Sequence, residues 1–310
     1  MGGRYVRPFL SVYGHVSIDQ IISVNEFPEN NTSVDVMEKT LKMGGTATNI
    51  AVIAASLGTP TAVCAFVGTD FPKEFEDILK EKNVIIDELI KLKDHYTSMA
   101  MIINNSRMDQ KVLFMQGPQG CASSLNIELT KNAKRSEYVH FSTGEPKYYI
   151  ELMDKLKGNG KIVFDPAQEI HEKWTDGLFE KAFERSDILF CNEHEAKSAM
   201  KYLGVNSFSE IRKEIAVCTK GSKGSDAYFN GRKVTVPAIK GRKVKDPTGA
   251  GDAYRAGFYS GLFRRYSEEE SLIIASATSS FIVEAVGALS NIPTWDEVME
   301  RADRELTRIS

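Results

Sequence analysis

Residues 246–252 (DPTGAGD) place two glycines and a carboxylate at the expected start of a helix. The first amides of a helix have no partner within it, so together with the helix dipole they favour an anion such as phosphate. Asp252 would repel that phosphate unless it takes a proton from the hydroxyl that attacks it. The stretch therefore predicts a kinase that acts on an alcohol. Asp252 would be the general base, and the amides of Gly249, Ala250 and Gly251 would stabilise charge on the transferred group.

Polar and glycine residues near the N-terminus form a second candidate site. Asp19 follows the first expected strand, where a carboxylate can accept hydrogen bonds from neighbouring hydroxyls. Gly44 and Gly45 open the first long helix and allow a ligand to approach the backbone, and Asn49 lies one turn later on the same face. Taken one at a time, these residues are explained equally well without a ligand. Asp19 can be a turn aspartate, and the helix start can need its glycines for packing.

Two further strands are followed by candidate ligand residues. Asn192 and Glu195 offer one amide and one carboxylate, which suit a magnesium ion that keeps most of its waters. Asp165 and Gln168 (DPAQ) lie at another strand end. They are candidates to contact the substrate directly or to support the residues that do so. A plain X-Pro turn fits Asp165 as well.

A glycine-containing loop, TKGSKG, leaves the strand that ends at Thr219. Thr219 and the amides of Gly221 and Gly224 can meet phosphate oxygens, so the loop is a candidate nucleotide site. Lys220 belongs to that loop without a catalytic role, and a solvated charge is the plainer interpretation of its side chain.

Taken in order along the chain, these motifs resemble the ribokinase-like family of sugar and nucleoside kinases, most of all the archaeal nucleoside kinases. The resemblance spans nearly the whole chain and implies ATP as phosphoryl donor, Mg²⁺ organised through water by Asn192 and Glu195, and substrate hydroxyls held by Asp19, Gly45 and Asn49. It also implies K⁺ near Asp246 and Thr248 in some members, and a homodimer through the lid. Many relatives have Thr where this chain has Pro247, which leaves the K⁺ site open.

The acceptor is predicted to be a nucleoside, phosphorylated on its 5′-hydroxyl. The lid segments balance basic against acidic residues, which disfavours a sugar phosphate. Met99, Met101, Phe114 and Met115 offer an apolar wall for a nucleobase, or else form the core of the lid itself. A kinase for ribose or another free sugar is the alternative, and a non-catalytic nucleotide or sugar sensor is a more distant one.

These motifs need a fold that brings strand ends together. Short β-branched runs alternate with helical stretches, which predicts an α/β fold with a doubly wound, mainly parallel sheet and helices on both faces. Residues 21–42 and 97–116 break the alternation and predict a small β-sheet lid inserted into one kinase domain, residues 1–310. Thr294 and Glu297 predict a capping box at the final helix.

Composition narrows the class of protein. A net charge of −3 and a pI near 6.0 favour neither nucleic acid nor a membrane surface as partner. The charge-free stretch 272–283 is too short to span a bilayer and predicts a buried helix. Four widely spaced cysteines and the lack of a signal-peptide pattern predict a reduced, cytoplasmic protein. P-loop, dinucleotide-binding and protein-kinase motifs are absent from the sequence.

Overall fold

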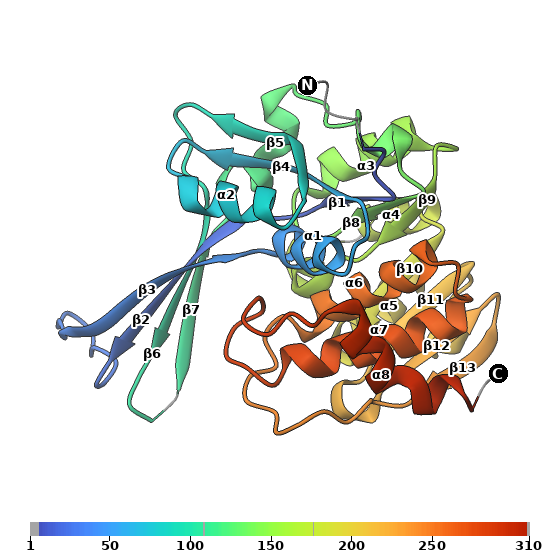
Figure 1. The fold of residues 1–310 in the computed structure, drawn as a ribbon. Coiled ribbons are helices and arrows are strands. Elements are labelled where there is room, and N and C mark those ends of the chain that lie inside the picture. The colour runs from blue at the N-terminus through green and yellow to red at the C-terminus, as the bar shows by residue number, and fades with distance from the viewer. Residues whose placement is uncertain (1–5, 108, 176, 309–310) are drawn as a thin grey trace, which may run out of the picture.

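The computed structural model describes residues 6–107, 109–175 and 177–308, so Met108, in the second expected insertion, lies outside the described residues. A nine-stranded sheet forms the body, in the order β13-β12-β11-β10-β9-β8-β1-β4-β5 (Figure 1). Its strands are β1 (Leu10–Tyr13), β4 (Thr61–Gly68), β5 (Ile85–Leu92), β8 (Tyr138–Phe141), β9 (Lys161–Phe164), β10 (Ile188–Asn192), β11 (Ile215–Thr219), β12 (Ser225–Phe229) and β13 (Arg232–Val236).

The sheet is parallel from β11 to β5, and the hairpin β12–β13 adds two antiparallel strands at one edge. The chain runs outward from β1 through β4 to β5, then returns to β8 and runs outward the other way. The order therefore reverses between β1 and β8, and ligands of such sheets bind at the carboxyl ends of the strands beside that point. The predicted fold class is confirmed.

Helices cover both faces of this sheet, because each buries an apolar side against it (Figure 1). One core contains residues of α1 (Thr46–Ser56), α2 (Lys73–Glu81), α6 (Ala250–Phe263), α7 (Glu268–Ile282) and α8 (Trp295–Leu306). The other contains residues of α3 (Pro146–Leu156), α4 (Leu178–Arg185) and α5 (Glu193–Leu203).

Two local predictions about helices are confirmed. The capping box at α8 forms, with the Thr294 hydroxyl and the Glu297 carboxylate each bonded to the other's backbone amide. The charge-free stretch falls mostly in α7, which is buried along most of its length. Among the described residues, no helix combines the length and apolar character that crossing a membrane requires.

A separate four-stranded sheet, here called the lid, extends from the body (Figure 1). It consists of β2 (Ser17–Val24), β3 (Val36–Gly44), β6 (Ser98–Asn104) and β7 (Gln110–Met115), in the order β3-β2-β6-β7. The lid therefore begins earlier than expected from the sequence, because only three residues separate the end of β1 from the start of β2. Asp19 consequently lies on a lid strand and not in a loop at the edge of the main sheet, which corrects the sequence-based placement.

Candidate active site

The carboxyl ends of β1, β9, β10 and β11, the inner face of the lid and the N-terminus of α6 surround one cavity of about 750 Å³. Most residues predicted from the sequence line it: Asp19, Gly45, Asn49, Asp165, Gln168, Asn192, Glu195, Thr219, Gly221, Thr248, Gly249, Gly251 and Asp252. We call this space the acceptor cavity.

A second cavity of about 500 Å³, the donor cavity, adjoins the first. Thr219, Gly221 and Gly251 line both cavities, so the two spaces meet at the start of α6. Ala250 and Gly224 line the donor cavity, whose wall is mainly apolar. A ligand in each space can therefore present its reacting group at the same point.

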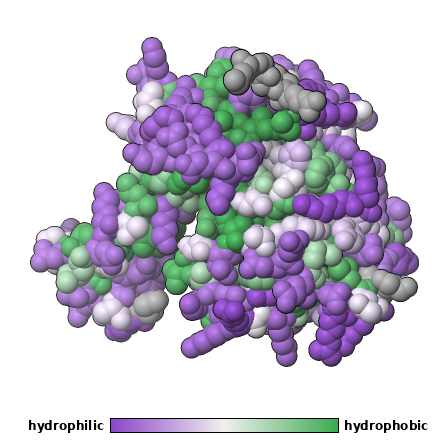
Figure 2. All heavy atoms as spheres, in the orientation of Figure 1, coloured by the Kyte–Doolittle hydropathy of each residue, from purple (hydrophilic) through white to green (hydrophobic). Residues whose placement is uncertain are grey.

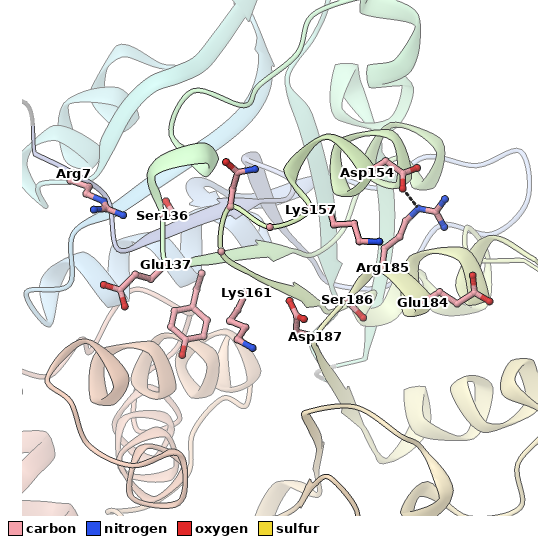
Figure 3. Close-up of a pocket in the computed structure, with 14 residues that line it drawn as sticks. Arg7, Ser136, Glu137, Asp154, Lys157, Lys161, Glu184, Arg185, Ser186 and Asp187 are labelled. Carbon is pink, nitrogen blue, oxygen red and sulfur yellow. Dashed lines mark hydrogen bonds and ion pairs between the residues drawn. The ribbon is translucent and has the colours of Figure 1, made fainter.

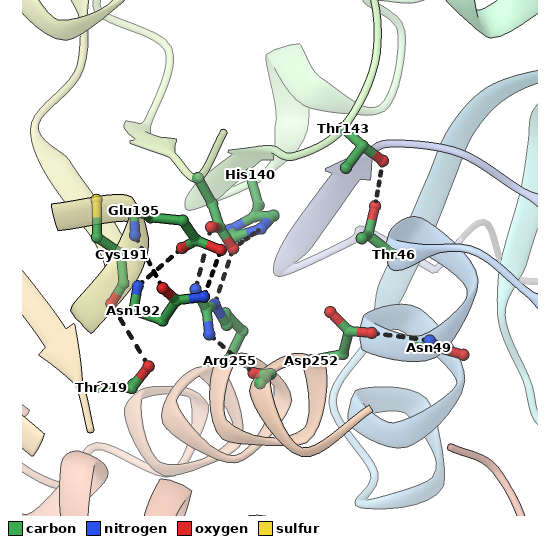
Figure 4. A network of polar contacts seen from close by, with 12 residues as sticks. Thr46, Asn49, His140, Thr143, Cys191, Asn192, Glu195, Thr219, Asp252 and Arg255 are labelled. Atoms are coloured by element: carbon green, nitrogen blue, oxygen red, sulfur yellow. Dashed lines mark hydrogen bonds and ion pairs between the residues drawn. The ribbon is translucent and has the colours of Figure 1, made fainter. Parts of the chain in front are cut away.

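Asp252 lies at this junction, in the first turn of α6, and lines the acceptor cavity. The side-chain amide nitrogen of Asn49, Nδ2, donates a hydrogen bond of 2.7 Å to the Asp252 Oδ2 atom (Figure 4). Burial raises the pKa of the Asp252 carboxyl to about 7, while the Asn49 bond and the Arg255 charge oppose that rise. A carboxyl with that pKa is matched to proton transfer near neutral pH.

The backbone at Gly249 fixes how α6 begins. Gly249 is the N-cap residue and has a φ of 77°, in the left-handed region that glycine adopts without strain. A Cβ atom at this position would lie 2.3 Å from the Ala288 Cβ atom, so there is also no room for a side chain. The first amides of α6 are thereby held toward the junction of the two cavities.

At the lid end of the acceptor cavity, Asp19 is half-buried and accepts a hydrogen bond of 2.8 Å from the Ser17 hydroxyl. Burial raises the pKa of its carboxyl. A Cβ atom at Gly44 would lie 2.1 Å from an Asp19 carboxylate oxygen, so only glycine leaves this carboxylate its place. Gly44 therefore acts here through Asp19 and does not itself line the cavity.

The apolar wall of the acceptor cavity differs from the predicted one. Asp19, Ala100 and Phe114 are paired across β2, β6 and β7 and therefore share one face of the lid, which lines the cavity. Met99 and Met115 form the neighbouring pair, one residue from Ala100 and Phe114 along their strands. Because side chains alternate along a strand, both methionines belong to the opposite face, as does Met101. Of the four proposed residues, Phe114 alone lines the cavity.

His15 and Thr143 are among the cavity residues that were missed in the sequence. His15 is buried directly after β1, and its Nδ1 atom lies 2.9 Å from the hydroxyl of Thr143, which follows β8. Burial lowers the pKa of His15 to about 4, so its ring is neutral, and the ring meets Phe114 edge to face. The signal that could have identified them is that they follow β1 and β8, the neighbouring strands between which the strand order reverses.

Asp165 is buried and belongs to a network of polar contacts at the wall of the acceptor cavity. Arg255 of α6 donates to it twice, from Nε to Oδ2 at 2.8 Å and from Nη2 to Oδ1 at 3.0 Å. The His140 Nε2 atom lies 3.4 Å from the same carboxylate. Both carboxylate oxygens thus have a protein donor, so contact behind the substrate is the better supported of the two predicted roles. Arg255 itself was not predicted as a site residue.

Asn192 and Glu195 form the capping box of α5 (Figure 4). The Glu195 carboxylate accepts hydrogen bonds from the Asn192 backbone amide at 2.8 Å and from its side-chain amide at 2.6 Å. Burial raises the pKa of Glu195 to about 7. Since these bonds use much of their donor and acceptor capacity, the pair suits contact with a metal through water rather than direct coordination. Among the described residues, no three acidic, His or Cys side chains cluster in a way that would hold a metal ion.

The two remaining predicted sites have distinct contacts. In the loop after β11, the Lys220 ammonium pairs with Asp226, which compensates its charge, while Gly221 of the same loop lines both cavities. Asp246 Oδ1 accepts from the Thr248 amide at 2.9 Å and Oδ2 from the Gly287 amide at 2.8 Å, so this carboxylate joins two loops.

A larger hollow of about 880 Å³ lies elsewhere, where β8 and β9 begin (Figure 3). Opposite charges pair beside it, Arg185 with Asp154 at 2.7 Å and Lys161 with Glu214. Glu137 and Lys161 mark the amino ends of these strands, the edge opposite to the predicted motifs. We therefore place the active site at the acceptor and donor cavities.

Comparison with known proteins shows the family of this chain. Residues 7–295 match the profile of the pfkB family carbohydrate kinases. The chain belongs to the pfkB family. A nucleoside kinase from Methanocaldococcus jannaschii is 36% identical over 98% of this chain and 99% of its own length. A nucleoside kinase from Methanothermobacter thermautotrophicus is 34% identical over 95% of each chain.

The crystal structure of the Methanocaldococcus jannaschii nucleoside kinase superposes with a TM-score of 0.88 at 35% identity, covering 96% of this chain and 99% of that one. The similarity thus includes the lid as well as the body. As a pfkB family member with these relatives, the protein is an ATP-dependent nucleoside or sugar kinase.

Proposed function

We propose that the protein transfers the γ-phosphoryl group of Mg-ATP to the 5′-hydroxyl of a nucleoside. The position of Asp252 carries the proposal: it lies at the meeting point of two cavities, beside the N-terminus of α6. A carboxylate with a pKa near 7 can accept a proton from an alcohol as the oxygen attacks phosphorus. Its place beside an anion site has no comparable use in a protein that only binds nucleotides.

The proposed mechanism assigns a task to each group. The nucleoside's sugar hydroxyls bind Asp19 on the lid, and its 5′-hydroxyl points to Asp252. Asn49 orients the Asp252 carboxylate and stabilises its ionised form. As the phosphoryl group moves in line from donor to acceptor, the amides of Gly249, Ala250 and Gly251 stabilise its charge.

Magnesium, held through water by Asn192 and Glu195, would neutralise charge on the ATP phosphates. The acceptor cavity fits this expectation because its wall is rich in carboxylates, which would otherwise repel ATP. A K⁺ ion near Asp246 and Thr248 stays a prediction, because both Asp246 oxygens already accept hydrogen bonds.

A nucleoside is favoured over a free sugar by aromatic surface in the acceptor cavity. Phe114, on the same lid face as Asp19, and the neutral His15 offer that surface. Nucleobases stack readily on such surface. The cavity size lies in the usual range for small-molecule sites, and two relatives more than 30% identical to this chain are nucleoside kinases.

The deciding test measures ADP release from ATP and Mg²⁺ with nucleosides, free sugars and sugar phosphates. We expect turnover with nucleosides at a kcat/KM at least about fivefold above ribose, since stacking contributes roughly 1 kcal/mol or more. A preference for ribose would keep the chemistry and replace the acceptor. ATP binding without turnover of any alcohol would instead support the sensor.

The pH dependence of kcat/KM offers a separate prediction. Because Asp252 acts in its ionised form, kcat/KM should rise with pH and level off above about 7. Asn49→Leu removes the donor to Oδ2, so the midpoint should move to higher pH. Coupling enzymes are assayed alone at each pH as control. A midpoint near 4 in the unmodified protein would contradict the role of Asp252.

The lid further supports a homodimer. Its outer face exposes Leu41 and Leu113, with exposed fractions of 48% and 56%, and Figure 2 shows hydrophobic residues among polar ones on the lid. Exposed apolar faces of this kind mark association surfaces. We expect sedimentation to show a dimer that Leu41→Asp converts to monomer, whereas Ile78→Asp on α2 leaves it intact. A monomeric unmodified protein at micromolar concentration would refute the dimer.

A further inference from the structure

Arg255 differs in charge from the other described residues that line the acceptor cavity. Six acidic residues contribute to that wall, and Arg255 is the one lysine or arginine among the described lining residues. The acidic residues are Asp19, Asp165, Glu169, Glu172, Glu195 and Asp252. The guanidinium is 5% exposed, so its charge is held inside the protein and not spread into solvent.

Its position follows from the geometry of α6. Helical side chains point back toward the N-terminus, so a residue in the second turn reaches the first. The Arg255 Nη1 atom accordingly donates to the Gly251 carbonyl at 3.2 Å, while Nε and Nη2 bind both oxygens of Asp165. One side chain thus ties the first turn of α6 to the end of β9, two elements 90 residues apart in the chain.

The remainder of the network holds this pair in place. His140 on β8 lies 3.4 Å from the Asp165 carboxylate through Nε2, and its Nδ1 atom lies 2.8 Å from the Tyr259 hydroxyl on α6. The Arg255 guanidinium also lies over the Phe190 ring, 5.2 Å from its centroid. Because these groups are buried and have fixed partners, the guanidinium has little freedom to leave its place.

We propose that Arg255, held by Asp165, is a positioning residue for phosphoryl transfer. It fixes the Gly251 peptide, and with it the anion hole and the Asp252 carboxylate, and it supplies the buried positive charge that keeps Asp252 ionised. This inference rests on the proposed function of Asp252. Arg255 touches neither substrate nor donor in this role and acts through Gly251 and Asp252.

The charged groups around Asp252 make the role measurable. Asp252 is influenced by Arg255 on its own helix, Asp165 at the end of β9 and Glu195 on α5, besides the Asn49 amide on α1. Arg255 lowers the pKa of Asp252, whereas Asp165 raises it. Removing one or the other charge should therefore move the pH midpoint of kcat/KM in opposite directions, which a merely structural pair would not do.

The experiment measures kcat/KM against pH for Arg255→Met, Asp165→Asn and Arg255→Lys. We expect the midpoint to rise by about 1 pH unit or more in Arg255→Met and to fall in Asp165→Asn. Arg255→Lys keeps the charge but loses the two-pronged contact. Its midpoint should stay near that of the unmodified protein while kcat falls about tenfold or more, since the Gly251 peptide is no longer fixed.

Folding is checked by circular dichroism and thermal unfolding of each variant. If Arg255→Met fails to fold because Asp165 is left buried without a partner, Asp165→Asn and Arg255→Lys still decide the matter. Midpoints that stay unchanged, or move the same way in both charge variants, would overturn the inference. The proposed function fails separately, through full activity of Asp252→Asn.

Discussion

Replacing Asp252 by Asn should lower kcat by at least about 10²-fold, the lower range for loss of a general base. The amide has nearly the shape of the carboxylate but cannot accept the proton of the attacking hydroxyl. KM for the nucleoside should change little, since the sugar hydroxyls bind at Asp19. Steady-state ADP release, with circular dichroism on the same samples, measures both constants.

Stability provides the control for this variant. The raised pKa means that the folded protein binds a proton at Asp252 more tightly than the unfolded chain does. Stability from this group is therefore lost as pH rises from about 4 through 7, where the buried carboxyl ionises. Asp252→Asn removes that cost, so at pH 8 its melting temperature should equal or exceed that of the unmodified protein. Near-normal turnover in a stable variant would refute Asp252 as the base.

Gly249→Ala should lower kcat by about 10²-fold as well, because it displaces the amides of the anion hole. The new Cβ atom would meet the Ala288 Cβ atom at 2.3 Å, and the left-handed backbone at φ 77° becomes strained. Either α6 or the loop at Ala288 must shift, and both border the site of transfer. The measurement is kcat at saturating ATP and nucleoside.

Gly158→Ala is the matched control for this substitution. Gly158 has a φ of 83°, yet nothing lies within 4 Å of a Cβ atom built there. It should thus lose a similar backbone free energy of about 1–2 kcal/mol and keep full activity. If Gly249→Ala and Gly158→Ala have equal kcat values, the start of α6 does not need its present geometry for catalysis.

Much of the fold and of the site followed from the sequence, for a physical reason. Parallel strands direct their carboxyl ends to one edge, so polar motifs after strands must converge there. Asn192, Thr219 and Asp165 accordingly meet around one cavity. The start of α6 was recognisable because glycines and a helix N-terminus act over a few neighbouring residues.

What escaped prediction depends on pairs that are distant in the chain. Asn49 and Asp252 are 203 residues apart, and no spacing rule links an amide on α1 to a carboxylate on α6. Arg255 was not predicted as a site residue, because its partner Asp165 lies on another element. The face of the lid to which Met99 belongs could not be predicted either, because it depends on the register between lid strands.

The separation of the lid from the main sheet bears on how the enzyme limits hydrolysis of ATP by water. Asp19 belongs to one sheet, whereas Asp252 begins a helix packed on the other. In the proposed mechanism a nucleoside contacts both residues, whereas a water molecule at Asp252 makes no contact with Asp19. Binding energy at the lid is therefore available to the reaction only when the true acceptor is present. We expect hydrolysis of ATP to be slow without nucleoside. The enzyme would then consume about one ATP for each nucleoside that it phosphorylates.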